Sequence, residues 1–268
     1  VSLAGVSSYA KILPNDVVED ASGNLYVTDL PNSQVYKIDA SGTASVLVHS
    51  SLIEGTDGIS WHANGFLIVS AFGGNKLFRV ATSGAGPINE LSISGGSGYV
   101  QTPDGVHFTP DGTALLVTST FGNLVYKLTS PDGWSSNATI VQEVSTTPAC
   151  PTPSAGVQMG SSDTMVVNCL HGFNTAVPLS FLAIDFSKGG DFGLASSTCP
   201  AVPPASQSPA GCVIPSAAGW VPEGFTYVPQ LGGFVIGNMY DATAGLGFVG
   251  WDGSVTQWVA PSDGLATT

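Results

Sequence analysis

The segment that decides the fold reads TDGISWHANGFLIVS and spans residues 56–70. It contains a turn with an acid, an apolar strand, a turn with glycine and a second apolar strand. The same order returns at residues 15–28, 103–118 and 222–237, and a weaker copy without the acid lies at 154–167. A unit made of strands alone that repeats about every 40–50 residues is typical of a β-propeller.

Each repeat supplies four strands, and in the first repeat we place them at residues 15–20, 24–29, 34–39 and 43–49. The inner strands are mostly apolar, as expected where a sheet is packed on both faces. We therefore predict an all-β protein with the β-propeller fold. Because the repeat runs from end to end, we expect residues 1–268 to form a single propeller domain.

The repeats are compatible with two numbers of blades. Five repeats are clear, and the tail at residues 261–265 resembles the opening of a sixth. Residues 9–13 look like an outermost strand that precedes the first repeat. Joining the two termini into a short composite last blade would close the ring without an exposed sheet edge. We favour a six-bladed propeller, with a five-bladed one as the alternative.

Four cysteines allow three pairings into disulfides. We favour Cys199–Cys212, which would pin a loop excursion at about residues 187–220 that is rich in glycine, proline, alanine and serine. Cys150–Cys169 then follows by elimination. Zinc is the alternative, but the chain has no C-x-x-C spacing and no histidine close to two of the cysteines.

Further features favour secretion. The cysteine count is even, lysine is scarce, and the chain holds one glycosylation sequon, Asn137-Ala138-Thr139. The chain begins with Val1, so we expect that either a signal peptide or a segment left out by choice preceded it. The sequence thus predicts a secreted protein that is glycosylated at Asn137.

The charge pattern excludes several classes of partner. The chain of 268 residues carries 6 basic and 19 acidic side chains, for a net charge of −13. Such a surface repels phosphate backbones and anionic membranes, so we expect no nucleic acid and no membrane as partner. No apolar run approaches the ~18 residues of a membrane-spanning helix. We expect a monomer whose partner is a small molecule.

In a propeller, the first strand of each blade lines the central channel. The start of this first strand and the loop after the second strand lie at the same end of the blade, because these two strands are antiparallel. One set of residues opens the first strands with an acid: Asp16, Asp57, Asp104, Glu223 and, in the tail, Asp263, with Ala155 as the gap. The other set follows the second strands and is mostly apolar: Leu30, Phe72, Phe121, His171, Phe173, Met239 and Tyr240. An apolar funnel with a few polar groups is typical of a small-molecule site.

The acids and histidines also have structural interpretations. Aspartate before glycine at a turn often accepts backbone N–H groups. Several carboxylates around one axis, however, raise each other's pKa and favour a cation, a shared proton or a ligand. His62 and His107 lie within first strands, where a packed, hydrogen-bonded histidine is the simpler interpretation. His171 lies in a loop and is the better candidate for proton transfer.

The strand openings, read together, resemble the gluconolactonase/regucalcin and strictosidine-synthase superfamily. The phrases that carry the resemblance are Asp57-Gly58-Ile59, Asp104-Gly105-Val106, Glu223-Gly224-Phe225 and GNLYVTD at 23–29. The resemblance implies a six-bladed propeller with its active site at the top of the channel. For the hydrolases it implies a divalent cation, usually calcium, held by Glu, Asn and Asp at the strand openings. The matching residues here are Glu223, Asp104, Asp57 and Asp16, with Asn15 one residue off.

The chain is also similar to fungal propeller proteins of secondary-metabolite pathways, which include hetero-Diels–Alderases. Such an enzyme holds two reactants in near-attack geometry and polarises one of them through a hydrogen bond. Our leading hypothesis is a secreted enzyme that needs no cofactor and catalyses cyclisation or cycloaddition of a largely apolar natural product. The residues that it assigns to catalysis are His171, Tyr240, Glu223 and Asp104. Those that it assigns to ligand binding are Asp16, Asp57, Leu30, Phe72, Phe121, Phe173 and Met239.

Two alternatives stay open. The first is a calcium-dependent lactonase or esterase of the gluconolactonase type, with Glu223, Asp104, Asp57 and Asp16 as metal ligands. The second is a propeller that binds a ligand without catalysis. A lectin-like site repeated in every blade is disfavoured, because Ala155 and the excursion at 187–220 break the symmetry of the fourth repeat.

Overall fold

The computed structural model describes a defined part of the chain: residues 3, 5–9, 11–159, 164–170, 172, 179–188, 213–214, 222–228, 233–238, 245–250 and 255–259. Within these residues the regular secondary structure consists of β-strands and short 3₁₀ helices. None of the described helices has the length and apolar character that spanning a bilayer requires.

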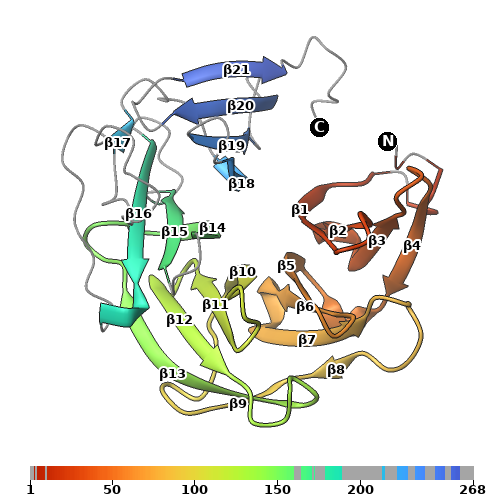
Figure 1. Cartoon of the computed structure of the whole chain (residues 1–268), viewed down its shortest axis with the longest axis horizontal. Helices are drawn as coiled ribbons and strands as arrows, with labels where there is room; N and C mark the ends of the chain where they lie inside the picture. The colour runs from red at the N-terminus through yellow and green to blue at the C-terminus, as the bar shows by residue number, and fades with distance from the viewer. Residues whose placement is uncertain are drawn as a thin grey trace. The chain divides into compact units, whose positions relative to one another are not determined.

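The described strands form five sheets, each built as a propeller blade (Figure 1). Blade 1 contains β1 (Pro14–Glu19), β2 (Leu25–Asp29), β3 (Gln34–Ile38) and β4 (Ala44–His49). Blade 2 contains β5 (Thr56–His62), β6 (Phe66–Ala71), β7 (Lys76–Ala81) and β8 (Asn89–Glu90). Blade 3 contains β10 (Pro103–Phe108), β11 (Ala114–Ser119), β12 (Leu124–Thr129) and β13 (Asn137–Ser145), with β9 (Ser92–Ser94) added in parallel to β13.

The last two sheets repeat the same strand order. Blade 4 contains β14 (Pro153–Met159), β15 (Thr164–Cys169), β16 (Leu179–Asp185) and β17 (Val213–Ile214). Blade 5 contains β18 (Pro222–Val228), β19 (Gly233–Asn238), β20 (Gly245–Gly250) and β21 (Val255–Val259). The chain divides into two compact units, residues 1–143 and 144–268. In the first unit the inner strand β5 packs beside both β1 and β10 (Figure 1).

Strand β6 shows why the inner strands are mostly apolar on both faces. Successive side chains of a strand point to opposite faces of the sheet. Leu67 and Val69 join a buried cluster with Tyr26 of blade 1. Phe66 and Ile68 join a second cluster with residues of blade 3. Both faces of the sheet are therefore buried, which accounts for an uninterrupted apolar run where a half-exposed strand would alternate.

The all-β propeller class predicted from the repeats is confirmed, and the five described blades match the five-bladed alternative. The outermost strand expected at residues 9–13 is wrong, because the described residues there have no strand conformation. Instead, Leu3, Val6 and Ile12 pack against the apolar cluster on blade 1, which covers that face of the sheet. The tail at 261–265, proposed as the start of a sixth blade, lies outside the described residues.

The disulfide Cys150–Cys169 is confirmed, with Cα atoms 5.0 Å apart. It joins the segment before β14 to the last residue of β15, so it ties together the two inner strands of blade 4. Cys199 and Cys212, and residues 189–212 and 215–220 of the expected loop excursion, lie outside the described residues.

Candidate functional site

The five first strands open in the same way. One residue at the start of the strand pairs with the last residue of the second strand, and two bulged residues follow before pairing resumes. The first bulged residues are Asn15, Asp57, Asp104, Ser154 and Glu223. The second bulged residues are Asp16, Gly58, Gly105, Ala155 and Gly224. A bulge re-aims side chains and is common next to functional sites.

This register corrects two predicted equivalences. Asn15, not Asp16, occupies the position of Asp57 and Asp104, and Asp16 occupies the position that glycine takes in blades 2 and 3. In blade 4 the equivalent residue is Ser154, so Ala155 is not a gap in the polar set. The error arose because the repeats were aligned on their acids, which shifted blade 1 by one residue. Matching them on the proline that opens four of the five strands would have avoided it.

Buried hydroxyl groups of the second strands connect the strand openings of the first unit. Asp16 N and Gly58 N donate to Thr28 Oγ1 and Ser70 Oγ at 2.9 and 2.7 Å. Thr28 Oγ1 donates to Asp57 O at 2.6 Å, and Ser70 Oγ donates to Asp104 O at 2.9 Å. The hydrogen bonds thus run from blade 1 through blade 2 to blade 3. The structure therefore brings together three predicted acids: Asp16, Asp57 and Asp104.

The carboxyl groups of these acids have different surroundings. Asp57 and Asp104 are buried, with 3% and 5% of their surface exposed. Thr120 Oγ1 donates a hydrogen bond of 2.8 Å to Asp104 Oδ2. Glu223 lies in β18 of the second unit, and its side chain is outside the described part of the structure.

Asp16 combines solvent access with close packing. Part of the residue remains exposed, whereas protein atoms surround its carboxyl group densely. Its Oδ2 accepts from Ile59 N of blade 2 at 2.9 Å, and its Oδ1 accepts from Val17 N at 2.8 Å. Burial raises the pKa of the Asp16 carboxyl to about 7, these two hydrogen bonds oppose the rise, and the charge of Asp104 adds to it. Near neutral pH the group is thus present in both protonated and ionised forms.

Aromatic side chains lie at the same end of the sheets as these acids. Phe72 begins the 3₁₀ helix η3 (Phe72–Gly74) directly after β6, and Phe121 follows β11 by two residues. Their rings meet edge to face, with centroids 5.7 Å apart. Phe121 is 55% exposed. The sequence-based prediction placed both rings at this edge, and the structure brings them into contact.

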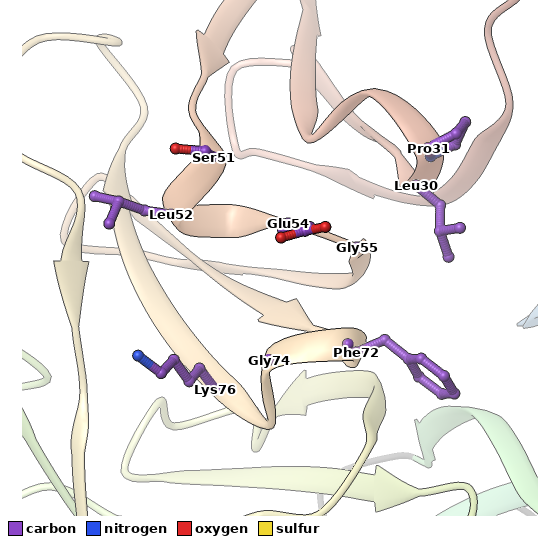
Figure 2. A pocket seen from close by; sticks show the side chains of 10 residues that line it. Leu30, Pro31, Ser51, Leu52, Glu54, Gly55, Phe72, Gly74 and Lys76 are labelled. Atoms are coloured by element: carbon purple, nitrogen blue, oxygen red, sulfur yellow. The ribbon is translucent and has the colours of Figure 1, made fainter.

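A cavity of about 510 Å³ adjoins this edge in the first unit. It lies between η1 (Leu30–Asn32), η2 (Ser51–Ile53) and η3. Figure 2 shows Leu30 and Phe72 on one side, Leu52 and Lys76 on the other, and Glu54 between them. Leu30 and Phe72 were predicted as ligand-binding residues. Leu52, Glu54 and Lys76 were missed, because two of them lie in the link between β4 and β5, outside the repeated phrase.

Several predicted site residues cannot be placed. His171, Phe173, Met239, Tyr240 and Asp263 lie outside the described residues. Their roles stay predictions.

Among the histidines of the first strands, His62 is packed at the other end of its sheet. Its ring stacks on Phe66 at 4.5 Å, and its Nε2 lies 3.3 Å from Gly112 O. Burial lowers the pKa of His62. This environment agrees with its interpretation as a structural histidine.

The described acids do not form the predicted calcium site by themselves. Within the described residues, no group of three or more His, Cys, Asp or Glu side chains is arranged to hold a metal ion. Both carboxyl oxygens of Asp16 accept backbone N–H groups, and Asp104 Oδ2 accepts from Thr120. Because the side chain of Glu223 lies outside the described part of the structure, the calcium site that the resemblance implies stays a prediction.

Comparisons with known proteins identify the fold. No protein-family model matches the chain, and no curated protein matches it. Among solved structures it is similar to a streptogramin B lyase, with a TM-score of 0.60, 17% identity and coverage of 95% of this chain and 71% of the other. It is similar to a catalytically inactive His-to-Ala variant of virginiamycin B lyase from Staphylococcus aureus with quinupristin (TM-score 0.59, 16% identity, coverage 95% and 72%). A chain of a nidogen/laminin complex matches with a TM-score of 0.63, 10% identity and coverage of 94% and 81%. At these identities the similarity establishes the fold alone.

Proposed function

We propose that the protein is an enzyme that binds a small, largely apolar molecule at the acid-bearing end of the first unit and catalyses its cyclisation or cycloaddition. The observation that carries the proposal is the Asp16 carboxyl, whose pKa of about 7 suits proton donation, at the same end of the sheets as the Phe72–Phe121 pair. A carboxyl that stays partly protonated at neutral pH can donate a hydrogen bond to a carbonyl oxygen.

The proposed reaction requires only that the protein position the reactants and donate a hydrogen bond. In a hetero-Diels–Alder reaction the two reactants combine, two σ bonds form at the expense of π bonds, and no group leaves. The aromatic edge would hold the reactants in near-attack geometry. The proton of Asp16 would polarise the carbonyl of one reactant and remain on the carboxyl afterwards. Burial would sustain this protonation, and the charge of Asp104 would add to it, because both raise the pKa of Asp16.

The proposal extends to residues of the second unit. His171, Tyr240 and Glu223 carry groups that donate hydrogen bonds or exchange protons, and the sequence places them at equivalent strand ends. His171 is the first residue to test in the second unit, because an imidazole gains and loses a proton near neutral pH. The similar lyases also show that enzymes use this scaffold.

The test uses an ortho-quinone methide, generated in solution, and an electron-rich alkene. We expect the full chain to accelerate their cycloaddition and to give one enantiomer in excess. Asp16→Asn should lower the catalysed rate by about 10²-fold, the usual contribution of a general acid. His171→Ala, Tyr240→Phe and Glu223→Gln should lower it as well.

Glu19→Gln is the control, because it changes the same charge at an exposed position of β1. This variant should react like the unmodified chain. A racemic product formed at the background rate would contradict the proposal, and so would full activity in all four site variants.

Calcium-dependent lactone hydrolysis is the second candidate, and the corrected register favours it. The equivalent positions now read Asn15, Asp57, Asp104, Ser154 and Glu223, a mixed set with an asparagine, as the resemblance to lactonases implies. Elemental analysis of protein purified without chelator tests it. If this candidate is right, calcium is present at one ion per chain and is lost in Asn15→Ala but kept in Asp16→Asn. Protein without calcium that does not open lactones contradicts it.

We place this enzyme in the secretory pathway or outside the cell. Cys150–Cys169 is consistent with such a location, since disulfides persist in oxidising compartments. Asn137 of the sequon is exposed at the start of β13, where its Nδ2 donates to Asp132 Oδ2 at 2.8 Å. Secretion of the protein and a mass shift that is lost in Asn137→Gln would support this location.

A further inference from the structure

We propose that the cavity between η1, η2 and η3 is a binding site for a small organic cation, namely a protonated amine or guanidinium carried on an apolar group. The inference goes beyond the proposed function, because it concerns equilibrium binding and holds whether or not the protein catalyses a reaction.

The size and the walls of the cavity suit a small molecule. Its volume of about 510 Å³ falls among those of ligand pockets, which run from about 300 to 1,000 Å³. Leu30, Pro31, Leu52 and Phe72 supply an apolar lining. Leu52 is 58% exposed, so a ligand that covered it would remove apolar surface from water. The apolar part of a ligand would therefore be stabilised by these four side chains.

The backbone holds the cavity in a defined shape. Phe72 N donates to Gly55 O at 2.9 Å, which ties η3 to the residue before β5. Gly55 has a φ of +69°, and a Cβ at this position would lie 3.1 Å from Gly73 N. Glycine therefore permits the close approach of the two segments. A preformed site loses less free energy to ordering when a ligand binds.

The charges in the cavity select a cation. Glu54 is exposed and lies between Leu30 and Phe72 on one side and Leu52 and Lys76 on the other (Figure 2). Within the described part of the chain, no residue donates a hydrogen bond to its carboxylate or pairs with it. The other charged residue of the lining, Lys76, is already neutralised, because its Nζ lies 2.7 Å from Glu90 Oε2. An anion would be repelled by Glu54, whereas a cation would gain a charge-assisted hydrogen bond.

Phe72 strengthens the preference for a cation. The face of an aromatic ring carries negative electrostatic potential and attracts ammonium and guanidinium groups within about 6 Å of its centre. The net charge of −13 also raises the local concentration of cations around the molecule. Both effects act in the same direction as Glu54.

Titration of the full chain with benzylamine, followed by NMR chemical-shift changes, tests the inference. Benzylamine is protonated at neutral pH, and benzyl alcohol and benzoate are its neutral and anionic counterparts. We expect benzylamine to bind more tightly than both, and to bind more weakly at high salt. Glu54→Gln should weaken its binding about fivefold, a typical size for one solvent-exposed charge contact.

Two further variants sharpen the test. Glu19→Gln removes one negative charge from a residue outside the cavity lining and should leave benzylamine binding unchanged. Lys76→Met removes the positive charge and should tighten binding or leave it unchanged. Equal binding of benzylamine and benzyl alcohol would overturn the inference. So would tighter binding of benzoate, equal effects of Glu54→Gln and Glu19→Gln, or no binding at all.

Discussion

Blades 1 and 2 open with the same two-residue bulge, and the second bulged residue differs in kind between them. In both, the second bulged residue donates its N–H to a buried hydroxyl of the second strand, Thr28 or Ser70. In blade 2 this residue is Gly58, and a Cβ there would overlap the carbonyl oxygen of Asp104. In blade 1 it is Asp16, whose side chain accepts a hydrogen bond from Ile59 N of blade 2. The comparison shows that the bulge is a shared framework, whose second residue permits close packing in blade 2 and carries a carboxyl group with a raised pKa in blade 1.

The largest expected effect comes from giving the second bulged residue of blade 2 a side chain, as its counterpart in blade 1 has. Gly58→Ala forces a methyl group against the Asp104 carbonyl, so the strands must separate. We expect a loss of about 2–4 kcal/mol in the free energy of unfolding, measured by urea denaturation. Gly73→Ala is the matched control, because a Cβ at Gly73 has no atom within 4 Å. Equal stability of the two variants would show that blades 2 and 3 are not packed this closely.

The next effect concerns the Thr28 hydroxyl, which joins the openings of blades 1 and 2. Thr28→Val keeps the shape of the side chain but removes the group that accepts from Asp16 N and donates to Asp57 O. Thr28 is fully buried, so these backbone groups would lose their partner away from water. We expect a loss of about 1–3 kcal/mol, measured by thermal unfolding. Thr28→Ser retains the hydroxyl and should lose much less, and equal losses in the two variants would refute the hydroxyl's role.

A smaller, pH-dependent effect follows from Asp16 itself. Between about pH 4 and pH 7 the folded protein retains a proton at Asp16 that the unfolded chain has released. Stability therefore falls as the pH rises through this range and is constant above it. Asp16→Asn removes this dependence. The free energy of unfolding of the variant, measured relative to that of the unmodified chain, should therefore rise by about 1–2 kcal/mol from pH 4 to pH 8. This value is reduced for partial solvation of the carboxyl group. Parallel stability curves for the two proteins would disprove the raised pKa.

The smallest effect on stability is expected at the aromatic edge. Phe121 is largely exposed and contacts Phe72 edge to face, so Phe121→Ala should change the free energy of unfolding by less than about 0.5 kcal/mol. The same variant should lower affinity for an apolar ligand, because the edge loses one of its two rings. A large loss of stability with unchanged ligand affinity would mean that Phe121 is a packing residue and not part of a site.

The fold was predictable because its signal is repeated. The expected strands of the first repeat, such as 24–29 and 34–39, agree with β2 and β3 to within one residue. The placement of Phe72 and Phe121 at the end of the sheets that carries the acids was also predictable, because the start of the first strand and the end of its antiparallel neighbour lie at a common edge. The register of the acids was not predictable from the sequence, because a bulge adds a residue without changing the apolar pattern that follows it. Glu54 lies outside the repeated phrase, so no periodic signal pointed to it.

The amino-acid sequence by itself determined the repeated strands, the propeller class and the end of the sheets where polar and aromatic residues gather. These features depend on local turn chemistry and on apolar patterning, which act over a few residues. The tertiary structure alone decided that Asn15 aligns with Asp57, that Asp16 takes a glycine position with a pKa near neutrality, and that Glu54 lies in the cavity lining with Leu30, Leu52 and Phe72. The alignment of Asn15 depends on how β1 pairs with β2 within blade 1. The other two features depend on atoms of a neighbouring blade or loop, because burial, hydrogen bonding and charge are set by groups that are close in space and distant in the chain.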